Sequence, residues 1–410
     1  MAILPNRTDF PQGIHRRCGD FHCTRRLFHN RGLQFGAASV IIRLLYWQIV
    51  RETMQDRISR LRADMELAGL DAVLLNSFTA IRYFSSFTSD EATVVVTASR
   101  AVLLTDFRYT IQAKASSGDR FEIVEVGGGA KHLAAVKQVL TDGNCKRVGF
   151  EDDIVCFATY QKYEAFDCTL VPFSAQLHKL RILKTPDEVL SLKKAQAIAD
   201  AAYTELLRTI HSGMTEKRVA AELLYICAKL GSEGPSFAPI VGSGPNGAMC
   251  HAIPSERKLQ KGDMVVLDYG CLVDGYCSDM TRTFAVGEPD DFAKSIYQIV
   301  LDAQLKALDG LHAGITGKAL DAIARDYIAS KGYGANFGHS LGHGFGLLIH
   351  EAPYASVTGE TTLEEGMTIT VEPGIYIEDR LGVRIEDCCV VTRDGKLNLV
   401  TASKELFHID

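Results

Sequence analysis

The sequence predicts a two-domain α/β protein, in which a mixed α/β amino-terminal domain precedes an α+β carboxy-terminal domain with an internal pseudo-twofold repeat. Three observations predict this fold class. The chain has 410 residues, which is long for one hydrophobic core, and 47% of them are apolar. Apolar runs of helical and strand-like period alternate from residue 55 onward. A marked helix start near residue 185 divides the chain, and a block that follows it recurs further along.

The amino-terminal domain begins with a helix whose apolar face is formed by Ile58, Leu61 and Met65, and Gly69 ends that helix. The strand "DAVLLN" follows, and the runs "TVVVTA" and "AVLLTD", joined by Ser99-Arg100, predict a hairpin. A strand at "FEIVEV", a helix at 131–140 and a strand at "RVGF" complete this part. We place the domain at residues 54–182.

The carboxy-terminal domain starts with a predicted capping box in "KTPDEV". Thr185 is a favourable N-cap, Pro186 suits the first helical position and Glu188 completes the box. The helix is expected to continue to about His211. We place this second domain at residues 183–410.

An internal repeat organises the second domain. The block "HSGMTEKRVAAELLYICAKLG" at 211–231 aligns without gaps on "HAGITGKALDAIARDYIASKG" at 312–332. Each block follows an apolar helix and precedes a glycine-rich strand region, so the domain is predicted to contain two copies of a helix-helix-sheet unit.

Residues 1–53 form an extension that we expect to lie outside the fold. The first fifty residues contain seven arginines and no lysine, which would also suit a targeting leader, and a misassigned start is the simpler explanation. Their apolar run is too short to span a membrane. Cys18, His22 and Cys23 could form half of a zinc site, but no second half follows.

Charge and cysteine content exclude several functions. The net charge of −6 gives no electrostatic footprint for a nucleic-acid partner. Eleven cysteines without any C-x-x-C pair are typical of reduced thiols, so we expect a cytoplasmic protein. The sequence therefore predicts a small or neutral partner, with no nucleic acid and no membrane.

Four acidic residues occupy matched positions of the repeat. Asp268 in "GDMVVLD" aligns with Glu372 in "GMTITVE", and Asp279 aligns with Glu386 about ten residues later. Placed in the middles of apolar strands, four carboxylates need compensating cations. Arg282 and Arg384 are too few, so two divalent metal ions are expected, most plausibly Mn²⁺, with Co²⁺ or Zn²⁺ as alternatives.

The segment "FGHSLGHGFGLLIHE" at 337–351 contains three histidines with different expected roles. His350 matches His251 of the first copy within one residue, whereas His343 falls opposite Ser243. The glycines around His343 are expected to allow a tight turn and leave room for metal and substrate.

The segment "GSGPNG" at 242–247 satisfies a dinucleotide-binding pattern but does not favour that function. Pro245 lies inside it and a strand-like sequence follows, whereas the fingerprint should join a strand to a helix.

These motifs resemble those of the pita-bread metallopeptidases, the family of methionine aminopeptidase, aminopeptidase P, prolidase and creatinase. The resemblance covers about residues 185–410, and residues 54–180, notably "IRYFSSFT" and "LLTDFRYTIQA", look like the amino-terminal domain of the aminopeptidase P and prolidase branch. It implies a pita-bread fold and, from relatives, a homodimer. That second domain argues against methionine aminopeptidase, and the intact carboxylates argue against creatinase.

Site residues follow from the resemblance by position. It implies that Asp268 chelates one metal ion, that His343 and Glu372 hold the other, and that Asp279 and Glu386 bridge the two. Glu372 would also act as general base for the attacking water. The remaining candidate catalytic residues are His251 and His350 as donors to the substrate carbonyl, His339 beside the residue after the cut, and Arg384 orienting the site.

The expected reaction is hydrolysis of the first bond of a peptide with proline in second position. We favour aminopeptidase P, because prolidases resembling the archaeal type have an arginine shortly after "HE" and this chain has Tyr354 there. Prolidase, an Xaa-Pro dipeptidase, is the alternative. A non-catalytic pita-bread binding protein is a third possibility that the complete ligand set argues against.

Overall fold

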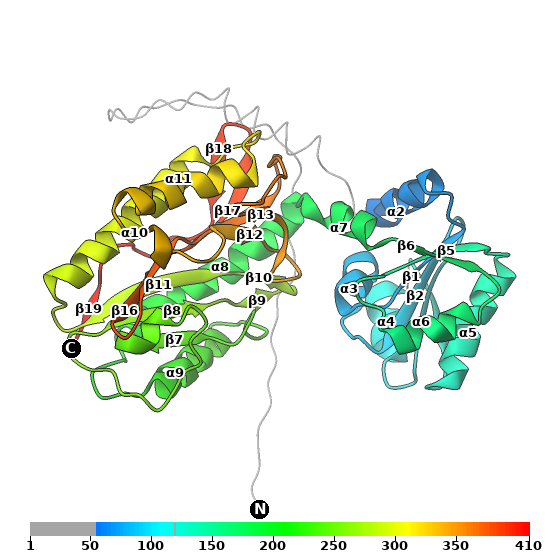
Figure 1. Cartoon of the computed structure of the whole chain (residues 1–410). Helices are drawn as coiled ribbons and strands as arrows, with labels where there is room; N and C mark the ends of the chain where they lie inside the picture. The colour runs from blue at the N-terminus through cyan, green and yellow to red at the C-terminus, as the bar shows by residue number, and fades with distance from the viewer. Residues whose placement is uncertain (1–54, 119) are drawn as a thin grey trace, which may run out of the picture. The chain divides into compact units, whose positions relative to one another are not determined.

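The computed structural model describes residues 55–118 and 120–410 (Figure 1). The expectations for residues 1–53, including the leader and the half zinc site, lie outside the described residues. Within the described residues, no helix combines the length and the apolar character needed to cross a membrane.

A six-stranded sheet forms the centre of the amino-terminal domain, in the order β4-β3-β2-β1-β5-β6. The predicted hairpin is confirmed, because β2 and β3 pair antiparallel with Val95 opposite Val102. The strands are β1 (Ala72–Leu75), β2 (Ala92–Thr97), β3 (Ala101–Thr105), β4 (Glu122–Glu125), β5 (Arg147–Phe150) and β6 (Thr169–Pro172). The helices are α2 (Gln55–Leu67), α3 (Phe78–Ser85), α4 (Thr110–Ser117), α5 (Ala130–Asp142), α6 (Phe157–Glu164) and α7 (Ser174–Ile182).

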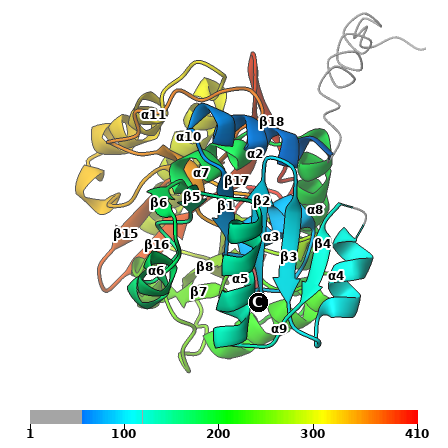
Figure 2. The ribbon, with the colours of Figure 1, turned by 90° about the vertical axis from the view of Figure 1, so that its right-hand side faces the viewer.

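Alternation along the strands gives this sheet two buried faces. Val73 and Leu75 of β1 pack in one cluster with α2, α3 and α7, whereas Ala72 and Leu74 pack in a second cluster with α5. Figure 2 shows α5 crossing one face of the strands. The domain is thus a three-layer α/β unit.

The carboxy-terminal domain is built of two helix pairs and several small sheets. Its helices are α8 (Pro186–Leu206), α9 (Glu216–Lys229), α10 (Asp291–Gly310) and α11 (Gly317–Ser330), with short 3₁₀ turns η1 (Gly244–Ala248) and η2 (Gly334–Asn336). The strands are β7 (Ile240–Ser243), β8 (Met264–Tyr269), β9 (Leu272–Val273), β10 (Tyr276–Cys277), β11 (Met280–Val286), β12 (Gly342–Gly344), β13 (Glu351–Ala355), β14 (Thr368–Val371), β15 (Gly374–Ile377), β16 (Leu381–Arg384), β17 (Asp387–Thr392), β18 (Gly395–Asn398) and β19 (His408–Ile409).

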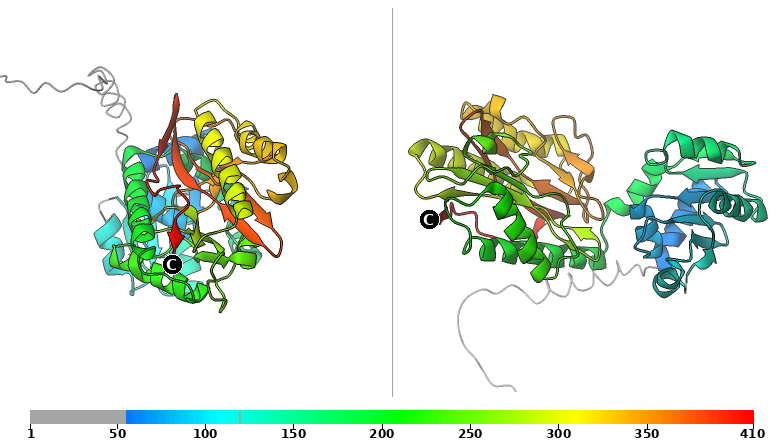
Figure 3. Two further views of the ribbon diagram at one scale, coloured as in Figure 1. Left: turned by 90° about the vertical axis from the view of Figure 1, so that its left-hand side faces the viewer. Right: turned by 90° about the horizontal axis from the view of Figure 1, so that it is seen from below.

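Each helix pair covers its own sheet. Helices α8 and α9 pack on the sheet β19-β11-β8-β7, and α10 and α11 pack on strands that include β14 and β17. In Figure 3 the green pair and the yellow pair lie on opposite sides of the strands. The two buried clusters therefore correspond to the two copies of the predicted unit.

The internal repeat is confirmed in backbone detail. Thr215 and Thr316 both cap their helices by accepting a backbone N–H three residues on, Arg218 and Ala319 respectively. The glycines near the two ends of each block all have positive φ, namely Gly213, Gly231, Gly314 and Gly332. The capping box at Thr185 and Glu188 is also present, with Pro186 as first residue of α8.

Two local expectations are wrong. Helix α8 ends at Leu206 rather than near His211, because Arg208 and Thr209 donate to carbonyls three residues back and tighten the last turn. Only Asp268 lies inside a strand, whereas the other three acids flank strands, Asp279 before β11, Glu372 after β14 and Glu386 before β17. Strand ends leave the backbone free to aim these carboxylates at one point.

Candidate metal centre

A cavity of about 310 Å³ opens in the carboxy-terminal domain and receives side chains from both copies of the repeat. All nine candidate residues line it: His251, Asp268, Asp279, His339, His343, His350, Glu372, Arg384 and Glu386. The sequence-predicted site residues are therefore brought together by the fold. Phe237, Ile240 and Ile349 add apolar lining.

The floor of the cavity is a cluster of buried carboxylates around one imidazole. One ligand atom each of Asp279, His343 and Glu386 lies within 4.8 Å of the others. The Nε2 atom of His343 is 3.3 Å from Glu372 Oε1 and 3.6 Å from Asp279 Oδ2. Its Nδ1 donates to the carbonyl of Gly344 at 3.0 Å, since a carbonyl only accepts. This bond orients the ring so that Nε2, the atom that would bind a metal, faces the acids.

Glycine is required beside His343 for close approach rather than for a turn. A Cβ on Gly342 would stand 1.9 Å from the carbonyl oxygen of Thr370, and one on Gly344 would stand 2.4 Å from that of Ala352. Neither glycine is among those with positive φ. The missing side chains let β12 lie against β13 and β14, which places His343 next to Glu372.

Fixed donors hold three of the acids. Arg384 Nη2 donates to Asp268 Oδ2 at 2.6 Å, and the hydroxyl of Thr281 donates to Glu386 Oε2 at 2.7 Å. Thr370 donates to Glu372 Oε1 at 3.0 Å. Of the two arginines considered from sequence, Arg384 thus pairs with only one of the four acids.

The electrostatics of this cluster favour a bound cation. Burial, together with the charge of Asp268, raises the pKa of Asp279 well above its ordinary value, and burial with the charge of Asp279 does the same for Glu386. Burial also opposes ionisation of Glu372, but the hydrogen bond and charge of His343 prevail and lower its pKa to about 2. Each ionised carboxylate disfavours ionisation of its neighbours unless a positive charge lies between them.

The residues present fit a divalent metal pair. Asp268 Oδ1 and Glu386 Oε1 are buried and have no hydrogen-bond partner among the described residues. An orphaned buried carboxylate oxygen is costly, and a cation would satisfy both atoms. Four carboxylates with one imidazole match the hard ligand set of Mn²⁺, Co²⁺ or Zn²⁺.

Three further histidines line the cavity above the acids. The ring of His350 packs edge-on against that of His343 with centroids 4.3 Å apart. Burial and the neighbouring imidazole of His343 lower the pKa of His350, and burial lowers that of His339. A lowered pKa favours the neutral form of each ring, which carries a single N–H. His251 lies exposed in the lining.

Two site residues were not found from the sequence. The hydroxyl of Tyr376 accepts from Arg384 Nη1 at 2.7 Å and lies 2.8 Å from His339 Nε2. Because His339 Nδ1 donates to the carbonyl of Ser340, its Nε2 accepts the Tyr376 proton. Thr281 similarly accepts from Arg384 Nε at 3.0 Å while it donates to Glu386. Neither residue has a sequence signal of its own.

Comparison with known proteins finds a family match for each of the two domains. Residues 191–393 match Metallopeptidase family M24, and residues 57–183 match the Creatinase/Prolidase N-terminal domain. The chain is 35% identical over 357 residues to an Xaa-Pro dipeptidase of Pyrococcus horikoshii, covering 87% of this chain and 99% of that protein. Among solved structures, an Xaa-Pro dipeptidase from Bacillus anthracis is 43% identical with a TM-score of 0.84, covering 87% and 100%. An X-Pro aminopeptidase from Thermotoga maritima is 38% identical with a TM-score of 0.79, covering 84% and 99%.

Proposed function

Because the chain belongs to Metallopeptidase family M24 and carries a creatinase/prolidase amino-terminal domain, we propose that this metallopeptidase is an Xaa-Pro dipeptidase. The buried acids around His343, with two carboxylate oxygens unpartnered, carry the assignment to metal-dependent hydrolysis. The relatives named Xaa-Pro dipeptidase favour the dipeptide substrate over the aminopeptidase P activity that Tyr354 suggested. Aminopeptidase P activity is the competing candidate, because the chain is also similar to the X-Pro aminopeptidase from Thermotoga maritima.

Five residues would hold the metal ions. Asp268 would chelate one ion, His343 and Glu372 the other, and Asp279 and Glu386 would bridge them. When bound, the ions supply Lewis-acid polarisation and make a water molecule more acidic. Manganese is the ion we expect, because carboxylate oxygens dominate the ligand set.

The side chains of the cavity wall complete the chemistry. Glu372, whose carboxylate lies 3.3 Å from His343 Nε2 and lines the cavity, would take a proton from the attacking water. The imidazoles of His350 and His251 would donate N–H groups to the scissile carbonyl as negative charge develops on its oxygen. His339, oriented by Tyr376, would contact the residue after the cut, and Arg384 would keep Asp268 in place.

We further propose a cytoplasmic homodimer. The nine cysteines of residues 55–410 are all free thiols, which supports a reducing compartment. The homodimer is an expectation from the resemblance of the sequence to its family, and size-exclusion chromatography with light scattering would test it.

The decisive experiment compares two substrates on the Mn²⁺-loaded protein. An Xaa-Pro dipeptide should be hydrolysed with kcat/KM at least about tenfold above that of the matching Xaa-Pro-Yaa tripeptide, equivalent to about 1.4 kcal/mol of transition-state binding. A preference for the tripeptide would establish aminopeptidase P instead. If neither peptide is cleaved with Mn²⁺ or Co²⁺, the peptidase proposal fails. Glu372→Gln, purified in the same way, controls for contaminating peptidases.

A further inference from the structure

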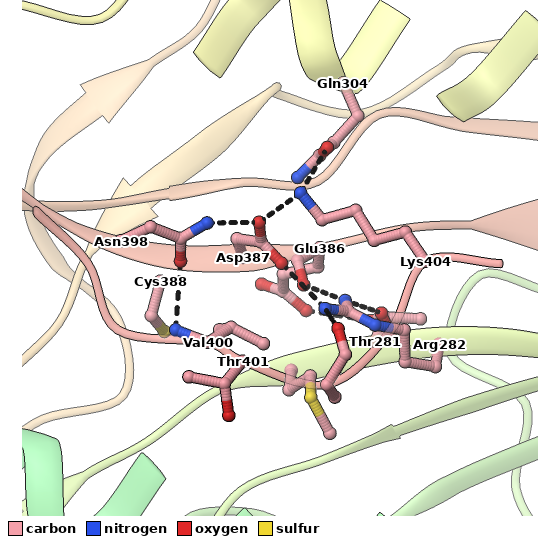
Figure 4. A network of polar contacts seen from close by, with 12 residues as sticks. Thr281, Arg282, Gln304, Glu386, Asp387, Cys388, Asn398, Val400, Thr401 and Lys404 are labelled. Atoms are coloured by element: carbon pink, nitrogen blue, oxygen red, sulfur yellow. Dashed lines mark hydrogen bonds and ion pairs between the residues drawn. The ribbon is translucent and has the colours of Figure 1, made fainter. Parts of the chain in front are cut away.

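A buried polar network lies behind Glu386, and none of its other members lines the cavity. Arg282 on β11 is 1% exposed and ranks among the largest fully buried side chains of the described residues. Asp387, the first residue of β17, is 0% exposed and follows Glu386 directly. Figure 4 shows the two side chains facing each other, with Asn398 and Lys404 contacting Asp387 and Gln304 contacting Lys404. A charged group this deep in a core needs a specific role.

Arg282 uses its guanidinium to join four carbonyls and one carboxylate. Its Nη1 donates to the carbonyls of Thr281 at 2.9 Å and Glu386 at 2.6 Å. Its Nη2 donates to Asp387 Oδ1 and to the carbonyl of Ala402, both at 2.9 Å, and its Nε donates to the carbonyl of Ser403 at 3.1 Å. The planar guanidinium of Arg282 therefore connects β11 to the start of β17 through hydrogen bonds.

Asp387 links this point to residues 398–404, here called the tail segment. Its Oδ2 accepts from Asn398 Nδ2 at 2.6 Å and pairs with Lys404 Nζ at 2.5 Å. Lys404 also donates to Gln304 of α10 at 3.0 Å. In the middle of the tail segment, the amide and hydroxyl of Thr401 donate to Asp200 of α8. The tail segment thus ties the point behind Glu386 to one helix from each copy of the repeat.

The contacts converge on the two acids that are expected to bridge the metal ions. Arg282 holds the carbonyl of Glu386, while the amide of Glu386 donates to the carbonyl of Thr281 at 3.1 Å. The Thr281 hydroxyl holds the Glu386 carboxylate. The thiol of Cys388 donates to the carbonyl of Asp279 at 3.0 Å. Both backbone groups of Glu386 and one oxygen of its carboxylate are therefore fixed before any ion binds.

The repeat indicates that this network is not a general requirement of the fold. In the alignment that pairs Asp279 with Glu386, Arg282 falls on Cys389 and Asp387 falls on Met280. Both counterparts are buried and carry no charge. The equivalent position of the other copy is therefore packed without an ion pair. We infer that the role of Arg282 concerns Glu386 and not the packing of the repeat unit.

We propose that Arg282, supported by Asp387 and the tail segment, is a positioning residue that holds Glu386 in its metal-bridging orientation and thereby sets the affinity of the site for metal. This inference rests on the proposed function, which makes Glu386 a ligand. Groups that orient a metal ligand commonly change metal affinity by about 10- to 100-fold when they are removed. Arg282 acts through Glu386, since it does not line the cavity.

The test is calorimetric titration of Mn²⁺ into the metal-free full chain. Arg282→Met removes the guanidinium and leaves Asp387 paired with Lys404 and Asn398, so no carboxylate is left without a partner. We expect its Mn²⁺ affinity to fall about 10- to 100-fold. Hydrolysis should be weak at low Mn²⁺ and approach the wild-type kcat at saturating Mn²⁺. Arg282→Lys, which can donate to some of the carbonyls, should recover part of the affinity.

Arg257→Met is the matched control, because Arg257 forms another partly buried ion pair, with Asp263 at 2.5 Å, and its hydrogen bonds go to Ser243, Lys258 and Asp263, none of which is an expected ligand. It should lower the melting temperature without changing Mn²⁺ affinity. A folded Arg282→Met protein with wild-type Mn²⁺ affinity overturns the proposal, as does activity that added Mn²⁺ does not restore. If Arg282→Met does not fold, the same Mn²⁺ titration is made with Asp387→Asn. We expect this variant to bind Mn²⁺ more weakly than wild type, and unchanged Mn²⁺ affinity would contradict the proposal. Wild-type protein that binds no Mn²⁺ would instead refute the proposed function.

Discussion

At the scale of single residues, Asp279 is the acid on which the metal assignment depends most. Its carboxylate lies close to both His343 Nε2 and Glu386, as the proposed bridging role would require. Asp279→Asn keeps the size of the side chain and removes its charge, and we expect Mn²⁺ binding at both positions to weaken at least about tenfold. Metal analysis after gel filtration measures this. Asp274→Asn, at an exposed turn, is the control, and unchanged metal content in Asp279→Asn would exclude the bridging role.

Tyr376 is a second residue whose role can be isolated. Tyr376→Phe removes the hydroxyl between Arg384 and His339 and leaves His339 Nε2 without its donor. A buried polar atom left unpaired costs about 1–3 kcal/mol, so we expect kcat to fall about tenfold or more while metal content stays constant. Tyr269→Phe removes a hydroxyl that donates to the carbonyl of Ala199, outside the cavity, and should keep its kcat. Equal losses in both variants would argue against a role for Tyr376 in orienting His339.

The residues found from sequence and those missed differ in a physical way. Asp268 and Glu372 are charged groups in otherwise apolar runs, and their matched positions in the repeat make them visible without a structure. Thr281 is an ordinary strand residue until its hydroxyl meets Glu386, which lies 105 residues later in the chain. Arg282 was considered a counter-ion for the four acids, but it pairs with Asp387. Partner choice among buried charges depends on tertiary placement.

At the scale of elements, helix α9 carries a buried acid that organises the loop in front of the site. Glu216, in the first turn, accepts the backbone N–H groups of Ser243 and Ser255 and both of their hydroxyls, together with the amide of Asn246. This loop contains His251. The acid therefore fixes the two ends of the segment that brings His251 to the cavity.

The hydrogen bonds of Glu216 predict a pH-dependent contribution to stability. Burial opposes its ionisation, but the bonds from Ser255 and Ser243 prevail and lower its pKa below the ordinary value of 4.5. A depressed pKa gives stability above pH 4.5 that is lost as the pH falls through the folded pKa. Glu216→Gln should lower the melting temperature at pH 7, and its difference from wild type should shrink as the pH falls below 4.5. Glu222→Gln on the same helix is the control, and a pH-independent difference for Glu216→Gln would contradict the assignment.

Helix starts were predicted better than strand ends. The capping box of α8 is a short-range pattern of Thr185 and Glu188, so the sequence contains all of its parts. Strand ends near Asp279 and Glu386 depend on which neighbouring strand supplies hydrogen bonds, and those partners lie far away in sequence. The close packing around Gly342 was likewise expected as a turn, because only the fold shows that the backbone of Thr370 approaches it.

At the scale of the whole molecule, the sequence predicted a mixed α/β domain, followed by two repeated helix-helix-sheet units. This prediction of the fold succeeded because the two copies of the repeat can be aligned with each other. Their matched glycines and helix caps then identify equivalent backbone positions. The substrate was predicted less well. The choice between dipeptide and longer-peptide activity rested on one residue of the cavity lining, Tyr354, which was too little to decide between them.

Removal of metal should lower the stability of the entire carboxy-terminal domain. The four acids come from both copies of the repeat, and each copy has its own hydrophobic core. A ligand that binds only the folded state at 100 times its dissociation constant stabilises it by about 2.7 kcal/mol, so chelation should lower the melting temperature by about 5 °C. Differential scanning calorimetry before and after dialysis against EDTA, followed by Mn²⁺ addition, measures the loss and its recovery. Asp279→Asn should show a smaller shift because it starts with less metal. A wild-type melting temperature that chelation leaves unchanged would mean that no ion joins the two halves, and the four acids would then have to share protons instead.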